Sequence, residues 1–149
     1  MKKTLITLAF LAINLFTATA QSEDAAIRKA IEEETSTFHT NADRNVFLSY
    51  WNITDATVML YSGGGNVVSL TGAQMKAATT NGTIPAPDGS VVSYENFVVR
   101  SSGNVAWASF IQQDTRKDGT KSPRMQEFRL MEKINGAWKI TSSSVHELK

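Results

Sequence analysis

Residues 124–146 read RMQEFRLMEKI-NG-AWKITSSSVH, which is two strand-like runs on either side of Asn135-Gly136. Asn-Gly between such runs is the strongest short-range signal for a two-residue type I′ hairpin. The turn fixes the register, so that Ile134 pairs with Ala137 and each residue further out pairs in step. Because side chains alternate between the two faces of a strand, a slip of one residue would exchange the faces.

In this register, one face of the hairpin changes character along its length. It is apolar beside the turn and polar further away, with the predicted pairs Lys133–Trp138, Met131–Ile140, Arg129–Ser142, Glu127–Ser144 and Met125–His146. A graded face is typical of a sheet that covers a core at one end and lines a cavity at the other. The hairpin therefore predicts a binding site, but it names no reaction.

The chain begins with a pattern typical of a secretory signal peptide. Lys2 and Lys3 precede an apolar run from Leu5 to Phe16, and Ala18-Thr19-Ala20 matches the small-residue pattern of a cleavage site. We expect cleavage after Ala20, so that residues 1–20 are the signal peptide and 21–149 form one domain, which is periplasmic or secreted. A retained N-terminal anchor is the alternative, although the apolar run is short for a membrane span of ~20 residues. After cleavage we expect no association with a membrane.

Charge and cysteine content exclude several classes of function. Cleavage would remove two of the 15 Lys and Arg residues, leaving 13 against 14 Asp and Glu. No basic patch with interleaved aromatic residues is present, so nucleic acid is not an expected partner. The chain has no Cys, which excludes thiol nucleophiles and thiolate metal sites. The two histidines are far apart in sequence and make no metal signature, so we expect neither a metal nor a cofactor.

The remaining pattern predicts an α+β domain. Apolar spacing and turn residues predict helices at 21–41, 43–52 and 71–80, strands at 57–61 and 67–70, and a four-strand meander at 91–101, 105–115, 124–134 and 137–146. In the first helix, Ile27, Ala30, Ile31, Glu34 and Phe38 follow the spacing of one face. Long antiparallel strands need one covered face, and the helices are the available cover.

This arrangement resembles the NTF2-like superfamily, which includes SnoaL-like, DUF4440-type and ketosteroid-isomerase-like proteins. The run Glu127-Phe-Arg129-Leu … Asn135-Gly-Ala-Trp138-Lys-Ile140 is similar to the E-x-R-V … D-G-x-W-x-I run that closes many such domains, including the association domain of calmodulin-dependent kinase. Trp51 followed by Asp55-Ala56 looks like the corner before the first strand of that fold. The resemblance implies a cone in which N-terminal helices pack on the concave face of a strongly curved antiparallel sheet, with a pocket between them.

The candidate ligand-binding residues are those expected to face this pocket: Arg129, Glu127, Tyr61, Trp51, Trp107, Ser142 and Ser144. Arg129 offers bidentate binding to a carboxylate or similar anion. The alternative is an internal ion pair with Glu127, which lies two residues along on the same face. Tyr50, Met59 and Phe110 are further expected wall residues. His39 is more typical of a helix surface than of the cavity mouth.

Two functions from different classes follow. The first is the binding of a small anionic or aromatic molecule without catalysis. The second is acid/base catalysis of the SnoaL or ketosteroid isomerase type, with Glu127, His146 and Tyr61 as candidates, which requires an acid and a base converging in the cavity. Relatives often carry histidines where this chain has Ser142 and Ser144. The opposite sheet face (Phe128, Leu130, Ile134, Val145) predicts a homodimer through the sheet, as the resemblance also implies.

Overall fold

The computed structural model describes residues 23–149, and the signal peptide predicted at residues 1–20 lies outside this range. Its elements follow the predicted order. A helix over residues 23–40 comes first, and then come α2 (Arg44–Leu48), β1 (Val58–Gly63), β2 (Asn66–Thr71), α3 (Gly72–Thr80), β3 (Val91–Ser102), β4 (Val105–Thr115), β5 (Met125–Ile134) and β6 (Ala137–Glu147). Within the described residues, no helix has the length and apolar character needed to cross a membrane.

The second helix is shorter than the predicted span of 43–52. Asp43 caps α2, since its side chain accepts a hydrogen bond from the backbone N–H of Asn45. The helix ends at Leu48, and Trp51 leaves it to form an isolated parallel bridge with Ile140 of β6. The prediction of a longer helix was wrong because the backbone of residues 50–52 pairs with the sheet instead.

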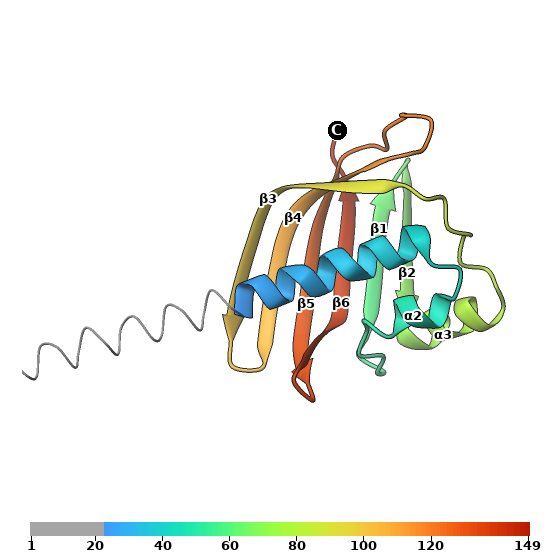
Figure 1. Ribbon diagram of the computed structural model, residues 1–149. Helices are drawn as coiled ribbons and strands as arrows, with labels where there is room; N and C mark the ends of the chain where they lie inside the picture. The colour runs from blue at the N-terminus through green and yellow to red at the C-terminus, as the bar shows by residue number, and fades with distance from the viewer. Residues whose placement is uncertain (1–22) are drawn as a thin grey trace, which may run out of the picture.

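The six strands form one sheet in the order β2-β1-β6-β5-β4-β3. The β3–β6 meander is antiparallel, as predicted, and so is the β1–β2 hairpin, whereas β1 joins β6 in parallel. The sheet curves around the helix over residues 23–40, which crosses it diagonally (Figure 1), while α2 and α3 lie at the β1–β2 end. The architecture is therefore α+β, with helices on the concave face of a mostly antiparallel sheet.

The Asn135-Gly136 turn has the geometry that the sequence predicts. Both residues have positive φ, 51° and 82°, as a type I′ turn requires. The predicted register holds from Ile134–Ala137 to Met131–Ile140. This end of the hairpin is therefore confirmed.

Beyond Met131 the register shifts by one residue. Thr141 has no partner on β5, and Leu130 pairs with Ser142. This is a β-bulge, which bends its strand and moves every later side chain to the other face. It lies where β6 passes from its bridge with Trp51 to its pairing with β1, which begins at Val58–Ser142. The neighbouring strand, rather than the turn, therefore decides the register here.

The bulge overturns the predicted pairs of the polar half. Arg129 pairs with Ser143, Glu127 with Val145 and Met125 with Glu147. Ser142, Ser144 and His146 pair with Leu130, Phe128 and Gln126 on the outer face. Val145, which we expected on the outer face, lies on the concave face instead.

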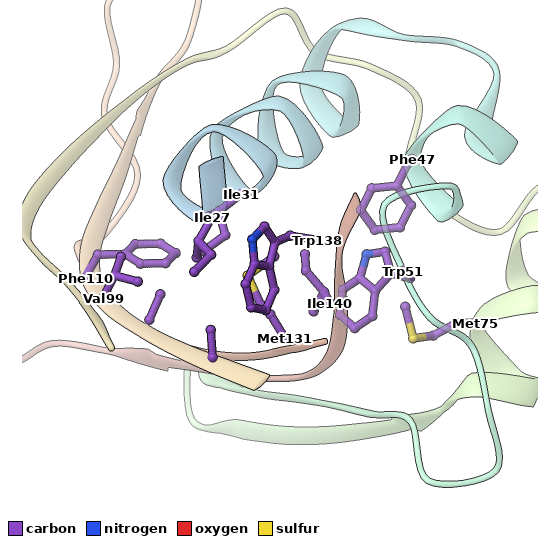
Figure 2. Packing of buried hydrophobic residues seen from close by; sticks show 12 residues of the cluster. Ile27, Ile31, Phe47, Trp51, Met75, Val99, Phe110, Met131, Trp138 and Ile140 are labelled. Carbon is purple, nitrogen blue, oxygen red and sulfur yellow. The ribbon is translucent and has the colours of Figure 1, made fainter. Parts of the chain in front are cut away.

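The core fills the end of the concave face nearest the Asn135-Gly136 turn. Ile27 and Ile31 point from the helix toward Met131, Trp138 and Ile140 in the sheet, as Figure 2 shows, with Phe110 and Val99 beside them. Ile27, Ile31, Met131 and Ile140 have no solvent exposure. The start of the helix is held over this core by Glu23, which pairs with Lys133 at 2.6 Å and accepts a hydrogen bond from Trp138 Nε1 at 2.9 Å.

Candidate functional site

The same helix covers a cavity of about 570 Å³ at its other end. The helix, α2, α3, residues 83–85 and the concave faces of five strands surround the cavity. Most of its lining is apolar or aromatic: Phe38, Phe47, Trp51, Met59, Tyr61, Val68, Leu70, Met75, Ala78, Ile84, Pro85, Met125 and Val145. Ligand pockets in proteins typically have volumes of ~300–1,000 Å³ and a mostly apolar lining, so this cavity has the size and character of one.

Arg129 lies in the wall of this cavity between two carboxylates. Its Nε and Nη2 donate to Oε2 of Glu127 at 2.9 and 2.7 Å, and its Nη1 lies 3.3 Å from both carboxylate oxygens of Glu34. All three side chains are buried. The internal pairing of Arg129 with Glu127, which the sequence left open, is therefore present and is extended by Glu34.

Glu34 reaches this cluster because it continues the buried face of the helix one turn beyond Ile31. Its Oε1 accepts a hydrogen bond from Trp51 Nε1 at 2.9 Å, and its Oε2 accepts one from Thr35 Oγ1 at 3.2 Å. The guanidinium of Arg129 also lies 5.9 Å from the centre of the Trp51 ring. Glu34 thus uses both of its oxygens, whereas Oε1 of Glu127 has no hydrogen-bond partner among residues 23–149.

The cluster contains two carboxyl groups and one guanidinium group, so acidic side chains outnumber basic ones. Burial raises the pKa of Glu127 above its ordinary value, and the nearby charges of Glu34 and Asp114 act in the same direction against the attraction of Arg129. Burial lowers the pKa of Arg129, but Glu127 and Glu34 more than offset this effect, so its pKa is raised. Arg129 therefore stays charged, and Glu127 takes up a proton more readily than an exposed glutamate does.

A second polar group lies at the rim of the cavity. His39 is buried, and its Nδ1 lies 2.9 Å from Oδ1 of Asp88, while its Nε2 lies 3.7 Å from Oδ2 of Asp114. A hydrogen bond from the Ser90 backbone and the contact with His39 lower the pKa of Asp88. The His39 carbonyl also accepts a hydrogen bond from the Gly89 backbone, so the histidine holds the 81–90 loop beside the cavity.

Four of the predicted site residues line the cavity, namely Arg129, Glu127, Trp51 and Tyr61. Ser142, Ser144 and His146 do not, because the bulge turns them to the outer face. Trp107 does not either: it stacks on Phe128 on the outer face, with ring centres 5.7 Å apart and planes at 20°. On β4, the buried positions are Ala106, Ala108, Phe110 and Gln112, so the alternation of the strand already excluded Trp107 and Phe110 from sharing a face.

The sequence interpretation missed Glu34, His39, Asp114 and Ser143. For Glu34 a signal was present, since a carboxylate stood within the apolar face of the first helix. His39 follows directly after that face, and the structure corrects its expected surface position. Ser143 lines the cavity in place of Ser142 and Ser144 because of the bulge, and the hairpin sequence carries no signal for that bulge.

The groups proposed for acid/base catalysis do not converge. Glu127 is bound by Arg129, His146 is exposed on the outer face, and Tyr61 lies at the mouth, with its hydroxyl close to Gly63. Within residues 23–149, no three His, Asp or Glu side chains are grouped so that they could hold a metal ion. The geometry supports binding better than turnover by this set of residues.

Neither models of protein families nor curated protein sequences match the chain. Solved structures do match its fold. An NTF2-like protein of unknown function from Pseudomonas putida is 12% identical with a TM-score of 0.64, over 85% of this chain and 87% of that chain. A second NTF2-like protein of unknown function, from Shewanella oneidensis, is 13% identical with a TM-score of 0.63, over 85% and 99%. The association domain of Caenorhabditis elegans CaMKII is 12% identical with a TM-score of 0.62, over 85% and 97%.

These likenesses show that the chain has the NTF2-like fold, as the resemblance of its closing hairpin indicated. Because the same fold supports many functions, the function has to be argued from the cavity itself.

Proposed function

We propose that the chain binds a small, mainly apolar molecule in the cavity beside Glu127. One observation supports this most directly: a cavity of about 570 Å³ with a mostly apolar lining contains a carboxyl oxygen of the buried Glu127 side chain, Oε1, that has no hydrogen-bond partner among the described residues. A polar group placed in an apolar pocket is the arrangement that fixes the orientation of a ligand. The anionic ligand considered from the sequence loses its support, because Arg129 already binds two carboxylates.

A neutral fluorescent dye, N-phenyl-1-naphthylamine, tests this proposal. Val68 and Val67 are neighbours on the edge strand β2, but only Val68 lines the cavity. Val68→Trp should weaken dye binding by about tenfold, since the larger ring enters the cavity, while Val67→Trp should leave it unchanged. Equal binding by both variants, or no binding by the unsubstituted protein, would contradict the proposal.

The outer face of the sheet supports a second role, as the interface of a homodimer. Trp107 and Phe128 stack on each other while 37% and 43% exposed, and Leu130 beside them is 39% exposed. Apolar side chains gathered on one sheet face are typical of protein interfaces. An association domain also has this fold. Sedimentation equilibrium should find a dimer that Phe128→Lys converts to a monomer, with Val91→Lys on the edge strand as the control.

The proposed place of action is outside the cytoplasm. This rests on the N-terminal pattern of basic, apolar and small residues, which lies beyond the described range. Mass spectrometry of the protein recovered from an exporting host should find a chain that begins at Gln21. Recovery of the intact N-terminus from a membrane fraction would instead support the anchor.

A further inference from the structure

The charged side chains of the cavity indicate which molecules it would admit. Glu34, Glu127 and Asp114 line the cavity, together with Arg129 and His39. With its acids ionised, this lining stays net negative even when His39 carries a proton. The guanidinium donors of Arg129 point at Glu127 and Glu34, so Arg129 is not free to bind an anionic ligand.

Two carboxylate oxygens of the lining are open to a donor. Within the described part of the chain, Oε1 of Glu127 and Oδ2 of Asp114 accept no hydrogen bond, although His39 Nε2 lies 3.7 Å from the latter. Oδ1 of Asp114 is used by Gln112 Nε2 at 3.0 Å. A ligand that brings positively charged N–H donors would satisfy these oxygens with charge-assisted hydrogen bonds.

The aromatic residues of the cavity point to the same chemistry. Phe38, Phe47, Trp51 and Tyr61 all line it. Aromatic ring faces attract ammonium groups, and they accept the hydrocarbon part of a ligand equally well. Resting on the proposed function, we propose that the molecule bound here is an apolar amine whose ammonium group lies against Glu127 and whose hydrocarbon part lies among these rings.

Binding of an amine would also change the protonation of Glu127. The charged groups that face Glu127 are Arg129 on its own strand, Glu34 from the helix and Asp114 from β4, while β6 offers only Ser143 and Val145. Burial raises the pKa of Glu127, so its carboxyl keeps a proton to a higher pH than an exposed glutamate does. Where Glu127 is protonated, an ammonium group would displace that proton and pair with the carboxylate. Binding of an amine should therefore release a proton, seen as a heat that depends on the ionisation enthalpy of the buffer.

Three probes of the same shape test the charge: 3-phenylpropylamine, 3-phenylpropanol and 3-phenylpropanoate, measured at neutral pH by displacement of N-phenyl-1-naphthylamine. The amine should bind roughly tenfold to a hundredfold more tightly than the alcohol, as one charge-assisted hydrogen bond allows, and the carboxylate should bind most weakly. If the dye binds and the alcohol or the carboxylate displaces it as effectively as the amine does, the amine assignment is overturned, but the proposed function is not. Failure of the dye itself to bind overturns the proposed function with it.

A substitution tests whether Glu127 is responsible for the tighter binding of the amine. Glu127→Gln should reduce the affinity for the amine to that for the alcohol and abolish proton release, while dye binding shows that the cavity persists. Glu132→Gln, on the same strand but outside the cavity, is the matched control and should keep the full preference for the amine. A Glu127→Gln protein that binds the dye and still favours the amine to the same degree would overturn the assignment.

Discussion

The two ends of the concave face differ although one helix covers both. Near the Asn135-Gly136 turn, Ile27 and Ile31 of the helix meet Met131 and Ile140, and all four side chains are fully buried. One turn further along, Glu34 meets Arg129, and the cavity opens beside them. Apolar side chains from helix and sheet can interdigitate fully, whereas a buried ion cluster is held by fixed hydrogen bonds and cannot expand to fill space. The filled end therefore supplies stability, and the hollow end supplies the site.

The largest expected effect is the removal of the cation from the hollow end. Arg129→Met leaves two buried carboxylates without their partner, so the free energy of unfolding should fall by about 3–5 kcal/mol. Adding Glu34→Gln and Glu127→Gln should recover part of this loss. Arg124→Met is the control, because Arg124 pairs with Glu95 at the surface, and it should cost at most about 1 kcal/mol in urea unfolding. Equal costs for the two arginines would contradict the importance of the cluster.

A matched pair of methionines compares the two ends directly. Met131 and Met125 share the concave face of β5, but Met131 is fully enclosed, and Met125 borders the cavity. Met131→Ala should cost about 2–5 kcal/mol of unfolding free energy, because it leaves a new void in a packed core. Met125→Ala should cost about 1 kcal/mol, since it only enlarges an existing space. Chemical denaturation of the two variants measures the difference, and the reverse order would contradict the distinction.

The pH dependence of stability gives a third comparison. The folded-state pKa of Glu127 is raised above its ordinary value of 4.5 by burial, so the folded protein holds this proton more tightly than the unfolded chain. The resulting stability is fully present below about pH 4.5 and is lost as pH rises through the folded-state pKa, at about 1.4 kcal/mol per pH unit or less for one proton. Denaturation of the unsubstituted protein and of Glu127→Gln across this range should differ by this slope. Parallel curves would contradict the raised pKa.

The smallest effect concerns the bulge. Ser143 Oγ is buried without a hydrogen-bond partner in the described structure, so Ser143→Ala removes an unsatisfied group and should raise the unfolding free energy by up to about 1 kcal/mol. Ser144→Ala, on the outer face, should change it by less than about 0.5 kcal/mol. If Ser144→Ala has the larger effect on unfolding, the register without a bulge is the correct one.

The order of elements and the closing turn were predictable because they depend on local signals, such as the helical spacing around Ile31 and the Asn135-Gly136 dipeptide. The pairing of Arg129 with Glu127 was also foreseeable from their spacing on one strand. The contribution of Glu34 was not, because it requires the helix to cross the sheet at a particular point. Ser142, Ser144 and His146 were misplaced because β1, a strand distant in sequence, sets the register beyond Thr141.

The bulge at Thr141 also leaves the last strand with a second arrangement close at hand. Across Ser142, Ser143 and Ser144, a slip by one position would replace one hydroxyl by another, so the chemistry there would hardly change. Without the bulge, however, Ser144 would replace Val145 opposite Glu127, and His146 would replace Glu147 opposite Met125 on the concave face. A variant that lost the bulge would thus place an imidazole on the concave face without any substitution among the residues that line the cavity.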